Sequence, residues 1–211
     1  YYQALTNRKV VYIPNGVAPA ERRSAELLSE YGLDGDDYVL FAARFVPEKG
    51  AHYLLEAFQR IDTPYKLVMA GDGAYGNRYA DEIKTQAGER IIFPGFVRGE
   101  LFDAFLSNAR LFVLPSDIEG LSTGLPEAMS YANCVLASDI EENLEALGDI
   151  GYTFKAGSVD DLEDKLRTLL VKNNLRQTCG KLARDYVHRC FDWDTVTSQF
   201  EELYSSLLTY R

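Results

Sequence analysis

The sequence has little cysteine and little histidine, which argues against several classes of site. The three cysteines, Cys134, Cys179 and Cys190, are odd in number and unevenly spaced among 211 residues. They fit free thiols of a reducing compartment better than a disulfide framework or a zinc site. The two histidines, His52 and His188, are too isolated to build a metal centre. We therefore expect no metal and interpret both histidines as surface or helix-face residues.

An excess of basic residues is also missing. Lysine and arginine number 22 against 32 aspartates and glutamates, for a net charge of −10. A nucleic-acid surface draws on broad positive charge, so we expect no nucleic-acid partner, and any phosphate site must be local. No apolar run approaches the ~20 residues that span a bilayer, so we expect no transmembrane segment. No signal peptide is visible, and because the chain opens on Tyr1 we expect a fragment of a longer protein.

Short apolar runs alternate with helical patterns along most of the chain. Most runs are continuously apolar, as in strands covered on both faces. The predicted strands are 10–13, 38–42, 66–70, 90–93, 111–114, 134–137 and 152–154. Helical spacing of apolar residues predicts helices at 51–58, at 159–169 after a capping-box-like Ser158 and Asp161, and at 193–208. The alternation predicts an α/β, Rossmann-like doubly wound parallel sheet with helices on both faces, followed by a C-terminal amphipathic helix.

In such a sheet, ligands bind beyond the carboxyl ends of the strands. The loops at those ends are 43–50, 71–76, 94–100 and 115–127, and we expect them to converge on one crevice. The second loop, GDGAYG, matches a dinucleotide fingerprint through Gly71, Gly73 and Gly76. The fingerprint also requires an acidic residue about 20 positions later, and here the next strand leads into PGFV. A slim turn that lets a ligand or another backbone pass close is the stronger interpretation.

The loop ARFVPEKG carries two cations, Arg44 and Lys49, just before a helix expected to begin near Gly50. A planar guanidinium and a compact ammonium suit diphosphate oxygens. The start of the helix is expected to add free amides and a positive dipole. On spacing alone, two solvated cations with Glu48 as partner are an equal alternative.

The loop EGLSTGLPE holds two carboxylates, Glu119 and Glu127. Pro126 suits the first position of a helix, which puts Leu125 at the cap and leaves the leading amides open to an anion. A glycosidase acid/base pair depends on a separation that sequence does not reveal, and a metal would need more ligands nearby. Binding of sugar hydroxyls fits better, because a carboxylate is a pure acceptor. Cations and carboxylates together favour a nucleotide sugar as ligand.

The order of these motifs resembles a known family. RFVPEKG, AGDG, PGFV and EGLSTGLPEAMSYANCVLASDIEENLE are similar to the C-terminal half of family 4 (group 1) glycosyltransferases of the GT-B fold, from about residue 10 to the end. The family has a glutamate, seven residues and a second glutamate, after an arginine and lysine loop. IPNGV at 13–17 looks like its interdomain hinge, and 193–208 resembles its crossover helix. The implied division is a hinge at 1–20, a donor-binding domain at 21–190 and a crossover helix at 191–211.

The resemblance implies a role for each matching position. Arg44 and Lys49 would grip the diphosphate and stabilise the leaving nucleotide, and Glu119 would hold the hydroxyls of the donor sugar. Glu127 would bind the ribose. The remaining donor-binding positions are the backbone around Leu121, Ser122, Thr123 and Gly124, the backbone at Phe96 and Val97, which would read the base, and the turn at Gly71 and Gly73.

The resemblance also implies a retaining hexosyltransferase that uses a UDP-, GDP- or ADP-sugar without cofactor or metal. The acceptor would be a glycan, lipid or small molecule. The resemblance implies that the protein is cytoplasmic, with peripheral contact at the inner membrane face if the acceptor is lipid-linked. The family's N-terminal, acceptor-binding domain is missing from this sequence, so we expect the fragment to bind donor weakly and to catalyse little. Ala132, among other positions, departs from the family, which commonly has glycine there.

Two other interpretations stay open from the sequence. The acidic surface and the apolar stripe of 193–208 are also compatible with a degenerate Rossmann-like module that binds another protein. The GDGAYG loop is also compatible with a nucleotide-sugar epimerase or an NAD-dependent enzyme.

Overall fold

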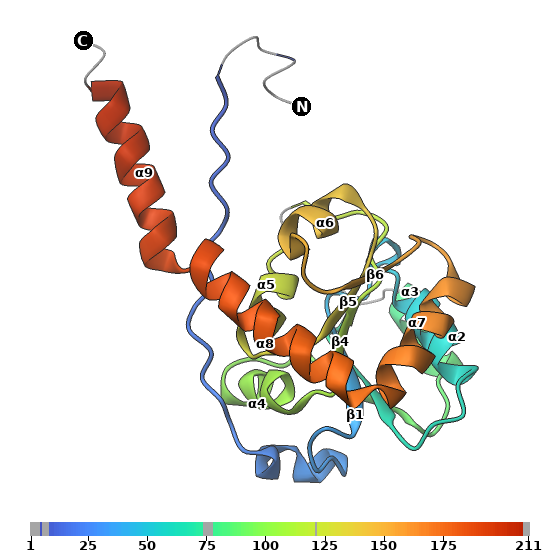
Figure 1. Ribbon diagram of the computed structural model, residues 1–211. Coiled ribbons are helices and arrows are strands. Elements are labelled where there is room, and N and C mark those ends of the chain that lie inside the picture. The colour runs from blue at the N-terminus through green and yellow to red at the C-terminus, as the bar shows by residue number, and fades with distance from the viewer. Residues whose placement is uncertain (1–4, 6–8, 74–77, 121, 209–211) are drawn as a thin grey trace.

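Six parallel strands form one sheet at the centre of the molecule (Figure 1). The computed structural model describes residues 5, 9–73, 78–120 and 122–208. In sheet order β3-β2-β1-β4-β5-β6, the strands are Ile91–Gly95, Lys66–Ala70, Tyr38–Ala42, Leu111–Leu114, Val135–Ser138 and Tyr152–Phe154. The order reverses between β1 and β4, which is the doubly wound arrangement, so the predicted fold class is confirmed.

Helices connect the strands and continue after the last one. Two are 3-10 helices, η1 (Ala25–Tyr31) and η2 (Pro47–Lys49). The α-helices are α2 (Ala51–Gln59), α3 (Arg78–Gln86), α4 (Glu100–Asn108), α5 (Gly124–Ser130), α6 (Glu141–Leu147), α7 (Val159–Val171), α8 (Asn173–Cys190) and α9 (Trp193–Leu208). The start of α7 is as predicted, since the Ser158 hydroxyl accepts a hydrogen bond from the Asp161 amide at 3.2 Å.

The side chains of each strand divide between two apolar layers. In β1, Val39 and Phe41 pack with α2, α3 and α7, whereas Tyr38 and Leu40 pack with η1, α4, α5 and α8. This alternation explains the continuously apolar strands in the sequence, because both faces of the sheet are covered by helices. Burial on both faces leaves the strand ends and their loops as the exposed polar part of the sheet.

The strand predicted at 10–13 does not form. Val10, Val11 and Tyr12 are extended and between 43% and 53% exposed, and no strand lies beside them among the described residues. The chain meets the body of the molecule at Val17, whose amide donates to the Phe191 carbonyl at 2.7 Å. An apolar run needs a neighbouring backbone to become a strand, and here the run leaves the domain without one.

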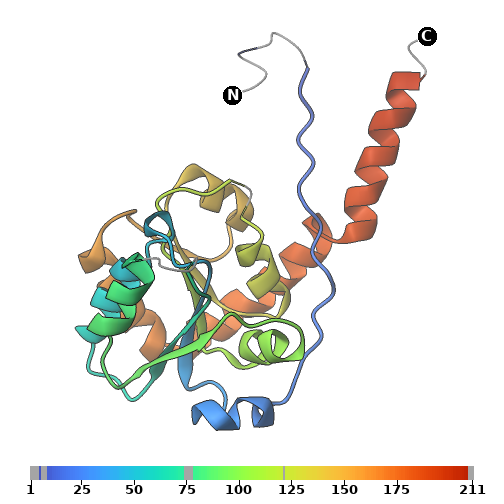
Figure 2. The same cartoon turned by 180° about the vertical axis from the view of Figure 1, so that it is seen from behind.

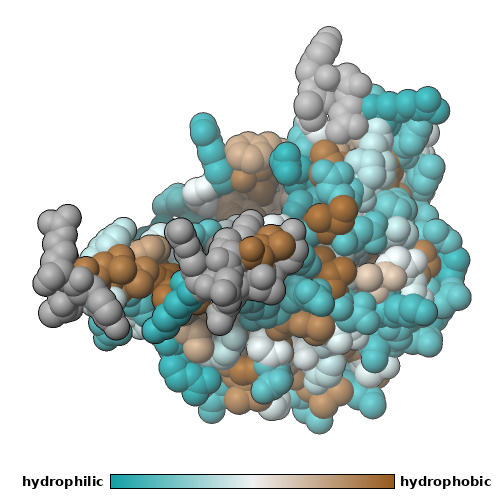
Figure 3. Space-filling model, turned by 90° about the horizontal axis from the view of Figure 1, so that it is seen from above, coloured by the Kyte–Doolittle hydropathy of each residue, from teal (hydrophilic) through white to brown (hydrophobic). Residues whose placement is uncertain are grey.

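Helix α9 leaves the domain on the same side as residues 9–16 (Figures 1 and 2). Of its side chains only Val196 is buried, whereas Phe200, Tyr204 and Leu207 are between 41% and 62% exposed. Seen from above, apolar side chains lie open among hydrophilic ones (Figure 3). The predicted helix at 193–208 is therefore confirmed, and its apolar stripe is largely uncovered.

Candidate functional site

The loops at the carboxyl ends of β1, β2 and β3 are joined by backbone contacts. The Ala43 amide donates to the Ala70 carbonyl at 3.1 Å, and the Gly71 amide donates to the Gly95 carbonyl at 2.8 Å. Gly71 has φ +132, and a Cβ at this position would lie 1.9 Å from the Ala43 carbonyl oxygen. The glycine after β2 thus lets another backbone pass close, as the turn interpretation of GDGAYG predicts. Gly76 of that motif lies outside the described residues.

A pocket of about 650 Å³ opens above these loops. Arg44, Gly71, Gly73, Phe96 and Val97 all line it, so five of the predicted donor-binding positions come together. Its other lining residues are Ala42, Ala43, Ala70, Asp72 and Phe102. Small side chains dominate the wall, which leaves room for a planar ligand beside one guanidinium.

The two cations of the first loop have different surroundings. Arg44 is exposed at the rim of the pocket and has no ion pair among the described residues. Lys49 instead contacts the predicted sugar-binding carboxylate, with its Nζ atom 2.7 Å from Glu119 Oε2. The Lys49 side chain is 17% exposed and that of Glu119 is 6% exposed. A cation and a carboxylate that are 70 residues apart in the chain therefore form a largely buried ion pair.

The loops that carry this pair touch each other along the backbone. The Asp117 amide donates to the Glu48 carbonyl at 2.9 Å. Gly50, at φ +66, lies so close to the second loop that a Cβ would be 2.0 Å from the Pro115 carbonyl oxygen. The alternative in which Glu48 pairs with solvated cations is not what the structure shows, because Lys49 pairs with Glu119.

Three buried polar residues lie behind the ion pair. The Ser116 hydroxyl donates to Glu119 Oε1 at 2.6 Å. The Ser138 hydroxyl donates to the Ser116 carbonyl and accepts from Asn143 Nδ2 at 2.9 Å. All three side chains are almost completely inaccessible to solvent. Sequence reasoning missed them because single serines and an asparagine carry no motif, and only the fold brings β4, β5 and α6 together.

The start of α2 differs from the expectation of free amides. The Tyr79 hydroxyl, which comes from α3, accepts a hydrogen bond from the His52 amide at 3.1 Å and lies 2.8 Å from His52 Nδ1. This hydroxyl acts as the helix cap, since Gly50 at the capping position has no side chain. The His52 amide is therefore already occupied. Burial lowers the pKa of the His52 imidazole.

Helix α5 begins earlier than predicted. It starts at Gly124 after an N-cap at Thr123, so Pro126 occupies the third helical position and Leu125 is inside the helix. A proline is tolerated there because the amides of the first turn have no partner within the helix. Glu127 remains in the first turn, as predicted.

The residues just before α5 are absent from the lining of the 650 Å³ pocket. Ser122 and Thr123 line a small separate pocket together with Tyr12, Asn15 and Glu142. Ser122 is only 5% exposed. Leu121 lies outside the described residues. The structure thus divides the predicted donor positions between two pockets, and Lys49, Glu119 and Glu127 line neither of them.

Glu127 is a half-buried carboxylate with an acidic neighbour. Burial, and then the negative charge of Asp103, raise the pKa of the Glu127 carboxyl. Asp103 itself accepts a hydrogen bond from the Tyr131 hydroxyl at 2.7 Å. No hydrogen bond to the Glu127 carboxylate is formed by the described residues. An acceptor group that is partly desolvated and lacks a donor is suited to a ligand with hydroxyls.

Comparison with known proteins identifies the family. The family described as glycosyl transferases group 1 matches residues 25–186. The chain belongs to the group 1 glycosyltransferases. The matched range contains both cations, both glutamates and the buried polar residues behind them.

Individual relatives agree with this assignment. A phosphatidyl-myo-inositol mannosyltransferase of Mycobacterium leprae is 32% identical over 212 residues, 94% of this chain and 54% of the relative. The sulfoquinovosyl transferase of Arabidopsis thaliana is 29% identical over 180 residues, 82% of this chain and 34% of the relative. This glycosyltransferase domain therefore spans about a third to a half of the length of these curated relatives.

Solved structures share the fold. A glycosyltransferase from Rickettsia africae superposes with a TM-score of 0.84 at 18% identity, covering 95% of this chain and 57% of that one. Anabaena HepE, solved with UDP and glucose, superposes with a TM-score of 0.79 at 22% identity, covering 86% of this chain and 52% of that one. These likenesses establish the GT-B type of Rossmann-like domain for the glycosyltransferase chain.

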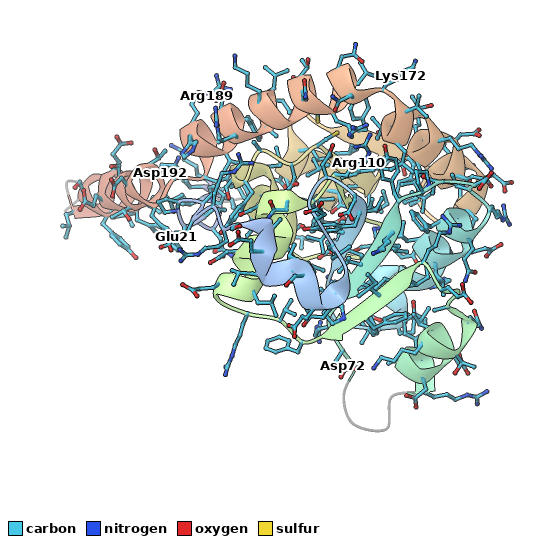
Figure 4. All side chains as sticks on the ribbon, turned by 90° about the horizontal axis from the view of Figure 1, so that it is seen from below. Glu21, Asp72, Arg110, Lys172, Arg189 and Asp192 are labelled. Atoms are coloured by element: carbon cyan, nitrogen blue, oxygen red, sulfur yellow. The ribbon has the colours of Figure 1, made fainter. Side chains whose placement is uncertain are left out.

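Other polar clusters of the glycosyltransferase domain lie away from the strand ends. Arg110, before β4, pairs with Asp36 at 2.7 Å and stacks over Tyr65 at the amino end of the sheet (Figure 4). Within the described residues no group of three or more histidine, cysteine, aspartate or glutamate side chains could hold a metal, and no helix is long and apolar enough to cross a bilayer. All three cysteines are free thiols, as expected.

Proposed function

We propose that this domain binds the donor of a retaining glycosyltransferase, which moves a hexosyl group from a nucleotide diphosphate sugar to a glycan, lipid or small-molecule acceptor. The observation that carries the proposal is the contact between Lys49 and Glu119, in loops at the same edge of the sheet as Arg44 and its pocket. A nucleotide sugar presents a diphosphate next to sugar hydroxyls, and this corner offers cations next to a carboxylate.

Each group of the ligand then has a chemical partner. Arg44 and Lys49 take the diphosphate and stabilise the negative charge that develops on the leaving nucleotide. Glu119 accepts hydroxyls of the transferred sugar, and Glu127 accepts the ribose hydroxyls. The base occupies the 650 Å³ pocket against the backbone of Phe96 and Val97 and beside Gly71 and Gly73. The amides of Ser122, Thr123 and Gly124, and that of Leu121, approach the diphosphate from the other loop.

The cations replace a metal in this mechanism, so the proposed reaction needs no cofactor. Anabaena HepE has been solved with UDP and with UDP-glucose, which supports a uridine nucleotide as the first ligand to test. GDP- and ADP-sugars are the alternatives within the same chemistry.

The rest of the enzyme is proposed to dock beside α9. Residues 1–20 serve as a hinge, 21–190 as the donor-binding domain and 191–211 as a helix that crosses to an acceptor-binding N-terminal domain. The exposed apolar side chains of α9 and the projecting segment 9–16 support this division. We place the enzyme in the cytoplasm, with any contact to the inner membrane face made by the other domain. The isolated chain should bind donor weakly and show little transfer.

The test is a calorimetric titration of this chain with UDP, GDP, ADP and their hexose conjugates. Lys49→Ala should weaken binding of the preferred nucleotide sugar by ~1.5–3 kcal/mol, the scale of hydrogen bonds to charged groups. Lys181→Ala removes an exposed lysine of α8 and serves as the matched control. Unchanged affinity in both Lys49→Ala and Glu127→Ala would overturn the proposal.

The uncovered stripe of α9 favours one other function, a protein-interaction module. A chain that binds none of the nucleotides but dimerises through 193–208 would support that function. Protection by a nicotinamide dinucleotide alone would instead support an NAD-dependent enzyme.

A further inference from the structure

The Glu119 carboxylate is held from both sides. Its Oε2 atom faces Lys49 at 2.7 Å, and its Oε1 atom accepts from the Ser116 hydroxyl at 2.6 Å. With one oxygen on each partner and the side chain only 6% exposed, rotation of the carboxylate would break a hydrogen bond or an ion pair. Glu119 is thus fixed in orientation, although it belongs to a loop and not to a helix or strand.

The hydrogen bond from Ser116 depends on a second layer of contacts. Ser116 follows β4 by two residues, and its carbonyl accepts the hydroxyl of Ser138 at the end of β5. Ser138 in turn accepts from Asn143 Nδ2, and its carbonyl lies 3.2 Å from the same nitrogen. The three side chains therefore link the ends of two adjacent strands to α6. All three residues are fully buried.

Asn143 has one buried polar atom that is paired and one that is not. Its Oδ1 atom is buried and has no hydrogen-bond partner among the residues that the structure describes. An unsatisfied buried acceptor destabilises the folded state, and an apolar side chain of the same size would avoid it. The Asn143 side chain contributes a donor instead, because its Nδ2 reaches both the hydroxyl and the carbonyl of Ser138 and so orients the group that holds the Ser116 carbonyl.

We infer that Ser116, Ser138 and Asn143 are positioning residues that fix the Glu119 carboxylate for the transferred sugar. The inference rests on the proposed function, because it assigns Glu119 to the sugar of a nucleotide sugar. A fixed acceptor is preorganised for hydroxyls, whereas a rotating one must be ordered when the ligand binds. The expected consequence is selective: the three residues contribute to the affinity for the sugar and not to that for the nucleotide diphosphate.

The experiment measures the affinity of the whole chain for the preferred nucleotide diphosphate and for its hexose conjugate, and compares their ratio among variants. Ser116→Ala should lower the preference for the conjugate about tenfold and change diphosphate affinity less than about twofold. Asn143→Leu should also lower the preference, with an unfolding midpoint equal to or above that of the wild type. Ser107→Ala, at a half-buried serine of α4 far from Glu119, is the control.

The outcomes separate the inference from the proposed function. If the wild type binds neither the diphosphate nor the conjugate, the proposed function fails. If the wild type prefers the conjugate and both Ser116→Ala and Asn143→Leu keep that preference, the inference fails while the proposed function stands. Equal wild-type affinity for the two ligands also overturns the inference, because Glu119 would then hold no sugar. If the variants lose affinity for both ligands to a similar extent, the three residues have a general structural role, and the inference is overturned as well.

Discussion

Lys49 Nζ lies 2.7 Å from Glu119 Oε2, so the cation proposed for the diphosphate and the carboxylate proposed for the sugar neutralise each other. Any diphosphate that reaches Lys49 must compete with this carboxylate. Separating a desolvated ion pair of this kind costs free energy, because each charge loses its partner. A ligand group that takes the place of the lost partner recovers part of that free energy.

Glu119→Gln should therefore raise the affinity of the chain for a nucleotide diphosphate without sugar. The substitution removes the negative charge beside Lys49 and leaves the ammonium free to meet the phosphates. We expect a gain of about tenfold, equivalent to ~1.4 kcal/mol, and loss of the preference for the sugar conjugate. Calorimetric titration with both ligands checks this, and Glu201→Gln on the exposed side of α9 controls for net charge. Weaker diphosphate binding by Glu119→Gln would show that the pair does not compete with the ligand.

Glu127→Gln should change stability and binding in opposite directions. Burial and Asp103 raise the pKa of the Glu127 carboxyl above its ordinary 4.5. The folded state then holds this proton more tightly than the unfolded state. The resulting stabilisation is complete below pH 4.5 and is lost as the pH rises through the raised pKa. Glutamine resembles the protonated carboxyl at every pH, so the variant should be more stable than the wild type at neutral pH.

Urea unfolding of Glu127→Gln and of the wild type, at neutral pH and below pH 4.5, tests whether the variant is the more stable protein at neutral pH. The stability difference should disappear at the lower pH, and nucleotide affinity at neutral pH should fall in the variant. A variant that is less stable at neutral pH would contradict the assignment of Glu127 as a partly desolvated carboxylate that destabilises the folded state when it is charged.

The fold and the main polar positions could be predicted from the sequence because they follow from local patterns. Six of the seven strands predicted from continuous apolar runs form, because a strand that is buried on both faces of a parallel sheet is apolar along its whole length. The seventh run, at 10–13, has the same apolar composition but no partner strand among the described residues. Whether a partner strand is present depends on the fold and cannot be predicted from the run itself. Lys49 and Glu119 were each recognised, but their direct contact depends on how η2 packs against the loop after β4.

The second layer of the site escaped prediction for a different reason. Tyr79 caps α2 from another helix, and Ser116, Ser138 and Asn143 act through contacts between elements that are distant in the chain. None of these residues has a spacing that marks it. The early start of α5 shows the same limit on a small scale, because a proline fits several positions of a first turn equally well.

Ala132→Gly should stabilise the domain. Ala132 follows α5 with φ +63, in the left-handed region where a Cβ crowds the backbone. Replacement by glycine, which the family commonly has here, should raise the free energy of unfolding by about 1 kcal/mol. Urea denaturation measures the change. Ala57→Gly, in the middle of α2 with a right-handed backbone, should destabilise by about the same amount or more. If both substitutions destabilise equally, the left-handed conformation at 132 is wrong.

Gly16→Ala should separate the segment before the domain from the start of α9. An added Cβ would lie 2.3 Å from Trp193 Cδ2, so the indole packs directly on the glycine backbone. The adjacent hydrogen bond from Val17 to the Phe191 carbonyl, at 2.7 Å, ties the same two segments together. The methyl group must displace the indole, which is already 51% exposed, further into water.

Trp193 is the only tryptophan of the chain, so its fluorescence reports on this contact alone. We expect Gly16→Ala to shift the emission to longer wavelength, because the displaced indole is more exposed to water. Gly88→Ala, where the nearest atom to an added Cβ is 3.8 Å away, should leave the emission unchanged. An unshifted spectrum for Gly16→Ala would mean that the indole does not rest on Gly16 in solution. Because the proposed hinge and crossover helix meet at this contact, the shift would also show that their close approach depends on the missing side chain at position 16.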